Sequence, residues 1–211
     1  IFHSLGEARN LAIENSEGAL IAFLDSDDLW LPSKLQEQVP LFDDKNVGIV
    51  ICDTIFFNEK GYQKQLYKKK PPPTGYVFKE MLSDYFISLE TVIIRKKSLS
   101  NLEFWFDTRF QVIEEYDLFV RLAYNWEIAY VDKILAKCRV HASSWTWSKS
   151  ELFPLEKKKM LKSLSNLIPD FKDKFSIEIN KVNQGIIIEE TKNIWHKKSR
   201  KEARRHLKNN F

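Results

Sequence analysis

The feature of this sequence that most constrains its fold is a short apolar run that ends in three aspartates. Residues 19–24 are all apolar, and Asp25, Asp27 and Asp28 follow directly. A short, continuously apolar run is typical of a strand covered on both faces of a parallel or mixed sheet. In open α/β sheets, ligands bind at the carboxyl ends of the strands, where these carboxylates stand. The run therefore predicts an α/β fold with a site at this edge of the sheet.

The three aspartates also predict a divalent cation. Carboxylates this close repel one another and raise each other's pKa unless a metal, an arginine or backbone donors compensate. Mg²⁺ and Mn²⁺ prefer oxygen ligands and commonly bridge one or two carboxylates to substrate phosphates. The alternative is a solvated turn in which Asp25 or Ser26 caps a helix that begins near Pro32.

Helical and apolar segments alternate around this turn. Helical spacing at 6–17 and 32–42 alternates with apolar runs at 19–24 and 48–52, which is typical of an α/β layer architecture. The helix at 32–42 has an apolar and a polar face. The residues expected to face inward are Leu35, Val39 and Phe42, and those expected to face outward are Lys34, Gln36 and Glu37.

The middle of the chain continues this pattern after an interruption. Residues 58–74 are polar, rich in lysine and end in three prolines, which indicates a surface loop or flap. The sequence then predicts a helix at 78–82 and strands at 91–94 and 128–139.

Two adjacent glutamates precede the last apolar helix of this part. Glu114 and Glu115 fall in its first turn, where the helix dipole favours negative charge. Adjacent side chains on a helix point about 100° apart, so the two glutamates cannot have the same role. We expect one to face a cleft and the other to form an ion pair, with Arg121 or Arg139. A cleft-facing carboxylate with a raised pKa is a candidate general base.

Beyond residue 150 the sequence changes character. Leucines at helical spacing predict a helix at 155–167, and residues 177–206 predict one or two helices interrupted at Gly185. We therefore expect two units, a core at 1–150 and a helical appendage at 151–211.

The net charge of the chain is only +4, but the positive charge is distributed unevenly. The C-terminal end is strongly basic. A solvated helix face, an anionic lipid surface and nucleic acid are the alternatives. The basic residues are not interleaved with stacking aromatics as in nucleic-acid-binding motifs, so we prefer a peripheral contact with a membrane.

The cysteines and the hydropathy bear on the compartment. Cys52 and Cys138 each lie in an apolar run without metal-type spacing, which indicates buried thiols in a reducing compartment. No apolar stretch is long enough to span a bilayer, and no signal peptide is visible. The sequence predicts a cytoplasmic protein, either soluble or peripheral on the inner face of the membrane.

Four motifs occur in a fixed order along the chain. They are residues 6–10 (GEARN), 22–32 (AFLDSDDLWLP), 114–118 (EEYDL) with Arg121-Leu122, and 138–141 (CRVH). In this order they resemble family 2 of the inverting glycosyltransferases, over about residues 6–147. The resemblance implies a GT-A fold, with a mixed, mostly parallel sheet flanked by helices. It also implies sugar transfer, with inversion, from a nucleotide-diphosphate sugar to an acceptor hydroxyl of a glycan or lipid-linked acceptor, in polysaccharide synthesis.

The resemblance also implies roles for individual residues. Glu115 stands where the family usually has an aspartate that deprotonates the acceptor, and its extra methylene moves the carboxylate outward. The implied metal ligands for Mn²⁺ or Mg²⁺ are Asp28, Asp27 and His141, and the implied donor-binding residues are Arg9, Asp25, Asp27 and Arg139.

Other interpretations stay open from the sequence. Members of the family begin with parallel strands that bind the nucleotide, and none precedes Ile1. We therefore expect a fragment of a longer protein, with an unpaired edge on the strand at 19–24. The alternatives are an inactive fragment, a metal-dependent phosphoryl-transfer or hydrolase domain, and a non-enzymatic module that binds nucleic acid through its basic tail.

Overall fold

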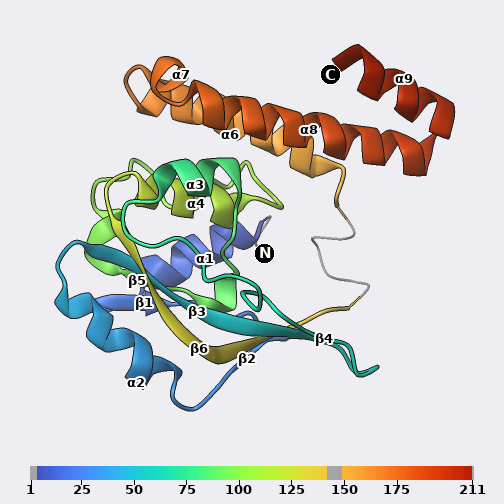
Figure 1. Cartoon of the computed structure of the whole chain (residues 1–211). Coiled ribbons are helices and arrows are strands. Elements are labelled where there is room, and N and C mark those ends of the chain that lie inside the picture. The colour runs from blue at the N-terminus through green and yellow to red at the C-terminus, as the bar shows by residue number, and fades with distance from the viewer. Residues whose placement is uncertain (1–3, 142–148, 211) are drawn as a thin grey trace.

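A computed structural model describes residues 4–141 and 149–210 of the chain, and it shows one curled sheet with helices on both faces (Figure 1). The sheet has the order β1-β5-β3-β6-β2, with β4 also paired to β3. The strands are β1 (Leu20–Ala22), β2 (Leu29–Trp30), β3 (Val47–Phe57), β4 (Gln63–Gln65), β5 (Ile93–Arg95) and β6 (Glu127–Arg139).

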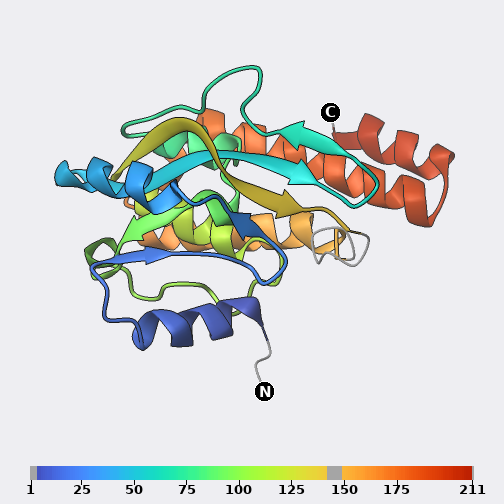
Figure 2. The same ribbon diagram turned by 90° about the horizontal axis from the view of Figure 1, so that it is seen from below.

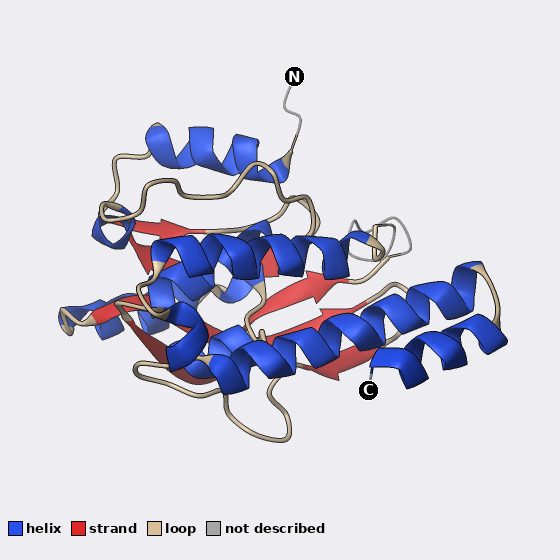
Figure 3. Ribbon diagram, turned by 90° about the horizontal axis from the view of Figure 1, so that it is seen from above, coloured by secondary structure: helices blue, strands red, loops and turns tan. Residues whose placement is uncertain are grey.

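The helices form layers around this sheet. α3 and α4 cover one face, α6 and α8 lie over them, and α1 lies alongside the β1 edge (Figures 1, 2 and 3). The α-helices are α1 (Leu5–Glu14), α2 (Lys34–Gln38), α3 (Phe78–Ser83), α4 (Glu114–Ala123), α6 (Leu152–Leu167), α7 (Phe171–Lys174), α8 (Ser176–Lys197) and α9 (Arg200–Asn210). The 3₁₀ helices are η1 (Val39–Asp43), η2 (Leu89–Thr91) and η3 (Lys96–Leu99).

The mixed α/β architecture is confirmed, but the prediction of a mostly parallel sheet is wrong. β3 and β6 are parallel, and each of the other pairings among the described strands is antiparallel. A parallel pair needs a long crossover, which α3 and α4 provide between β3 and β6. β4 instead returns directly from β3 through a turn in which Gly61 has φ +85°, and such a reversal makes strands antiparallel. β1 pairs only with β5 among the described residues.

The central strand β3 divides the apolar side chains between two cores. Because side chains alternate along a strand, Ile49 and Ile51 enter the large core beneath α3 and α4. Val50 and Cys52 enter a smaller core on the other face, with Phe42 of η1. All of β3 up to Thr54 is buried, so this strand holds the layers together.

The predicted orientation of the segment 32–42 is confirmed for Phe42, which is buried, and wrong for Leu35, Val39 and Lys34. Leu35 and Val39 are 48% and 42% exposed, whereas Lys34 and Gln38 are fully buried. Lys34 Nζ donates to Thr91 O at 3.2 Å, and Gln38 Nε2 donates to the same oxygen at 2.9 Å. A buried carbonyl needs a donor, so a contact distant in sequence overrides the apolar pattern. Burial lowers the pKa of Lys34 to about 8.

The C-terminal helices share the large core with the sheet. Met160 and Leu164 of α6 and Val182 and Ile186 of α8 belong to the same cluster of buried side chains as β3. α8 runs without interruption through Gly185, contrary to the prediction, because the neighbouring Val182 and Ile186 anchor both flanks. The chain breaks instead after Lys197. The boundary at residue 150 stays a prediction.

A glycine at the start of β3 offers a test of this packing. A Cβ added at Gly48 would lie 2.5 Å from Trp126 Cβ, so we expect Gly48→Ala to lower the free energy of unfolding by about 1–3 kcal/mol. Gly185→Ala is the control, because its added Cβ meets no described atom within 4 Å. Alanine in mid-helix should raise stability by about 0.5–1 kcal/mol. Urea unfolding measures both, and an unchanged midpoint for Gly48→Ala would contradict the packing.

Candidate functional site

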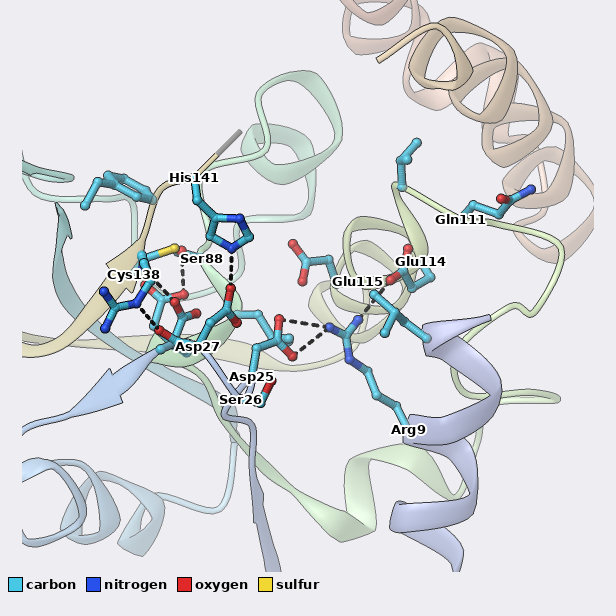
Figure 4. Close-up of a pocket in the computed structure, with 17 residues that line it drawn as sticks. Arg9, Asp25, Ser26, Asp27, Ser88, Gln111, Glu114, Glu115, Cys138 and His141 are labelled. Carbon is cyan, nitrogen blue, oxygen red and sulfur yellow. Dashed lines mark hydrogen bonds and ion pairs between the residues drawn. The ribbon is translucent and has the colours of Figure 1, made fainter. Parts of the chain in front are cut away.

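An open cavity of about 400 Å³ lies where β1, β3 and β6 end, between α1 and α4 (Figure 4). All the residues that the sequence predicted for the site line this cavity, although they come from four separate motifs. They are Arg9, Asp25, Asp27, Asp28, Glu115, Arg139 and His141. The structure therefore brings the predicted constellation together, while the chemical role of each residue stays a prediction.

Helix α1 supplies the cation between the two acidic segments. Asn10 fixes the helix, because its side chain accepts from Phe106 N at 2.9 Å and donates to Phe106 O at 2.8 Å. Arg9 then reaches Asp25 at 3.1 Å and Glu114 at 2.9 Å. Its side chain is only 13% exposed, so Arg9 offsets charge repulsion between carboxylates that are far apart in sequence.

The two adjacent glutamates have different environments, as the sequence predicts, but the expected ion pair is wrong. Glu114 pairs with Arg9 rather than with Arg121 or Arg139. Arg121 is instead held by Asp117, one turn earlier on the same helix, at 2.7 Å.

Glu115 faces the cavity, opposite Asp27 and His141 (Figure 4). Burial raises the pKa of the Glu115 carboxyl to about 8, and the neighbouring Glu114 and Asp25 add to the effect while Arg9 opposes it. A carboxyl group with a pKa near neutral pH can exchange a proton with a bound hydroxyl. Glu115 is therefore a candidate general base on the grounds of position and electrostatics.

The acidic turn meets the end of β6 through backbone pairing. β2 pairs with β6 directly after the turn, which places Asp28 where its Oδ1 accepts from Arg139 N at 2.8 Å. Asp27 Oδ2 lies 2.8 Å from His141 Nε2, and this hydrogen bond lowers the pKa of Asp27. The hydrogen bonds hold two aspartates at fixed positions on one wall of the cavity.

One group of side chains could hold a metal ion. Donor atoms of Asp28, Glu90 and Cys138 lie within 4.8 Å of one another. Glu90 is 2% exposed, and its Oε1 has no hydrogen-bond partner among the described residues. Burial raises the pKa of Asp28 to about 7, and the nearby Glu90 adds to this. Two crowded carboxylates with a free oxygen atom fit a hard divalent cation, whereas a thiol is a poorer ligand for Mg²⁺ or Mn²⁺.

Of the three predicted metal ligands, only one belongs to this group of donor atoms. Asp28 belongs to this set, while Asp27 and His141 bond to each other. Sequence reasoning missed Glu90, although a charged residue inside the apolar segment 89–94 is an available signal. It also predicted Cys138 as a buried thiol, but this residue is partly buried and lines the cavity, whereas Cys52 is fully buried.

Comparisons with known proteins place the chain in context. The model of glycosyl transferase family 2 matches residues 3–103. An uncharacterized glycosyltransferase of Methanocaldococcus jannaschii is 27% identical over 141 residues, which are 64% of this chain and 47% of that protein. The UDP-Glc:alpha-D-GlcNAc-diphosphoundecaprenol beta-1,3-glucosyltransferase WfgD of Escherichia coli is 27% identical over 139 residues, 65% of this chain and 52% of that protein.

A solved structure supports the fold. S. aureus TarS 1-349 in complex with UDP-GlcNAc superposes with a TM-score of 0.61 at 20% identity, over 98% of this chain and 59% of that chain. The chain spans about half the length of these two curated relatives. Among the helices that the structure describes, none is both long enough and apolar enough to cross a membrane.

Proposed function

Since this chain belongs to glycosyltransferase family 2, we propose that it transfers a sugar from a nucleotide-diphosphate sugar to an acceptor hydroxyl with inversion. The observation that carries the proposal is that one cavity joins an acidic wall, two arginines and a glutamate with a raised pKa. The relative WfgD is named for transfer to a lipid-linked sugar. A glycan or lipid-linked acceptor in polysaccharide synthesis is therefore the acceptor class that we propose.

The acidic wall and the arginines form the donor side of the site. Asp28, with Glu90 beside it, would hold Mn²⁺ or Mg²⁺, which would neutralise charge on the donor diphosphate. Arg139 lies at the rim, with its guanidinium 4.7 Å from the Phe57 ring centre and its side chain 31% exposed. From there it can stabilise the departing diphosphate, and His141 can add a hydrogen bond.

Glu115 forms the acceptor side, and the proposed reaction is a single displacement. Its carboxylate accepts the proton of the acceptor hydroxyl while that oxygen bonds to the anomeric carbon. The bond from the anomeric carbon to the diphosphate breaks at the same time, and its electron pair leaves with the nucleoside diphosphate. Attack from the face opposite the leaving group inverts the anomeric configuration.

The test is to incubate the intact protein with a panel of nucleotide-diphosphate sugars, Mn²⁺ and glycoside acceptors. We expect release of nucleoside diphosphate that depends on the acceptor, with an inverted anomeric centre by NMR. Cleavage of a phosphodiester substrate without sugar transfer would favour the phosphoryl-transfer alternative.

A second proposal concerns the basic end of the chain and an anionic membrane. Trp195 is 45% exposed, and the Arg200 guanidinium lies 5.1 Å from its ring centre. Exposed cations continue along α9, which is the arrangement of an interfacial anchor. They are Arg200, Lys201, Arg204, Arg205 and Lys208.

Neutralising Arg204 and Arg205 to alanine should weaken binding to vesicles with anionic lipid. Each cation contributes about 1 kcal/mol, so the expected loss is roughly 30-fold, measured by vesicle sedimentation. The matched control is Lys69→Ala with Lys70→Ala, two exposed cations of the loop before the prolines. Equal binding by both double variants would refute the membrane contact, and salt-sensitive binding to RNA instead would favour the nucleic-acid alternative.

A further inference from the structure

A second cavity, of about 470 Å³, meets the first one at Glu115. Val112 and Glu115 line both cavities. The second cavity lies between the end of α3, the start of α4 and the helices α6 and α8, which Figure 1 shows crossing above α3 and α4. The carboxylate proposed as the base therefore stands between a donor cavity and another space of similar size.

Two buried polar atoms in this second cavity lack partners. Tyr85 Oη and Glu189 Oε2 are buried and have no hydrogen-bond partner among the described residues, and both residues line the cavity. An unsatisfied buried polar atom costs about 1–3 kcal/mol, so such atoms call for a ligand. Tyr85 can donate and Glu189 can accept, so hydroxyl groups of a ligand in the cavity can satisfy these atoms.

The other walls of the cavity suit a sugar ring. The Tyr85 and Tyr116 rings lie 4.6 Å apart at 31°, and Tyr116 Oη is already used because it donates to Leu82 O at 2.6 Å. Phe153 of α6 adds a third aromatic side chain to the lining. Aromatic faces can pack against the C–H groups of a pyranose, while the hydroxyls need polar partners.

The charge of this wall is balanced. Lys157 Nζ of α6 lies 2.6 Å from Glu189 Oε1 of α8. Lys181 and Asp84 also line the cavity, so its cations and anions offset one another. The pair uses Glu189 Oε1 and leaves Glu189 Oε2 as an acceptor without a partner among the described residues. A neutral, hydroxyl-bearing ligand fits this wall better than a phosphate does.

Helix α6 is also fixed to the segment that carries the base. The buried carboxylate of Glu156 accepts from Gln111 N at 2.9 Å and from Val112 N at 3.0 Å. These residues lie just before α4, whose first turn holds Glu115. The wall of the second cavity and the base therefore move together.

We propose that this second cavity binds the terminal sugar residue of the acceptor, with its hydroxyls bonded to Tyr85 Oη and Glu189 Oε2 and the reacting hydroxyl directed at Glu115. The inference rests on the proposed sugar transfer. It assigns to α6 and α8 the recognition of a neutral pyranose rather than a purely structural role.

The test compares Tyr85→Phe and Glu189→Gln with Glu190→Gln in the intact protein. Glu190 is the next residue on α8, pairs with Lys158 and does not line the cavity, so it is the matched control. The acceptor probes are p-nitrophenyl glycosides of glucose, galactose and N-acetylglucosamine. The measurements are the KM for the acceptor, the Kd for the donor by calorimetry, and Tm.

We expect Tyr85→Phe and Glu189→Gln each to raise the acceptor KM about 10-fold, as the loss of one hydrogen bond predicts. Donor Kd should be unchanged, and Glu190→Gln should match the wild type. Unchanged acceptor KM in both variants, or a donor Kd that shifts as much as the acceptor KM, would overturn the proposal. So would donor turnover without any saturable dependence on these glycosides. Absence of all nucleotide-sugar turnover in the wild type would instead refute the proposed function.

Discussion

Replacing Glu115 with glutamine is expected to lower kcat by about 10²–10⁴-fold, the usual contribution of a general base. Glutamine keeps the size of the side chain but cannot take a proton. Because the proposed donor-binding residues Asp28, Arg139 and His141 line other parts of the cavity, donor Kd should stay within about twofold of the wild type. Glu80→Gln, which changes an exposed carboxylate on α3, is the control. Retained turnover in Glu115→Gln would refute the assignment of the base.

The raised pKa of Glu115 gives this prediction a pH dependence. Burial raises that pKa to about 8 from its ordinary value of 4.5, and only the ionised form accepts a proton. Turnover should therefore rise with pH up to about 8 and then level off. Folding stability should behave in the opposite sense. Between pH 4.5 and 8 the folded state binds more protons at Glu115 than the unfolded state, so this group lowers stability as pH rises. Glu115→Gln should remove that part of the decline in a series of urea unfolding curves.

Asp28→Asn is expected to abolish metal-dependent transfer, with a loss of roughly 100-fold or more. The Asn carbonyl oxygen can still accept the hydrogen bond from Arg139 N that Asp28 Oδ1 accepts at 2.8 Å. The substitution therefore removes charge while it keeps the backbone contact. Without the charge, Asn is a much weaker ligand for a hard cation.

A measurement independent of activity completes this experiment. Mn²⁺ binding, followed by electron paramagnetic resonance, should be lost in Asp28→Asn. Cys138→Ser tests the third member of the group near Asp28 and Glu90, and it should keep Mn²⁺ binding because a thiol is not a preferred ligand. Normal Mn²⁺ affinity in Asp28→Asn would contradict the metal site.

The sequence was most informative where function depends on short motifs. The acidic turn and the end of β6 were predicted as parts of one site, and β2 joins them through its pairing with β6. The pairing of individual side chains across the site could not be predicted. Arg9 and Glu114 are 105 positions apart, and no local pattern indicates that they pair.

The wrong prediction of which side chains in the segment 32–42 face inward also results from contacts between residues distant in sequence. Leu35 and Val39 look like an inward face, yet Lys34 and Gln38 occupy the interior because they donate to Thr91 O, more than fifty positions away. The periodicity of apolar residues along a helix depends only on the apolar character of each side chain. It does not record which backbone carbonyls in the finished sheet lack a donor.

The shared core of the sheet and the C-terminal helices has an evolutionary consequence. Met160, Leu164 and Ile186 are packed into the same cluster as the sheet, and Glu156 holds the loop before α4. A helical segment that is part of the core cannot be exchanged between related proteins as an independent domain. The core of the protein that receives it would have to be repacked. If the second cavity binds the acceptor, substrate preference on this scaffold should diverge by point substitutions among the residues of α6 and α8 that line it, and engineering should follow the same route.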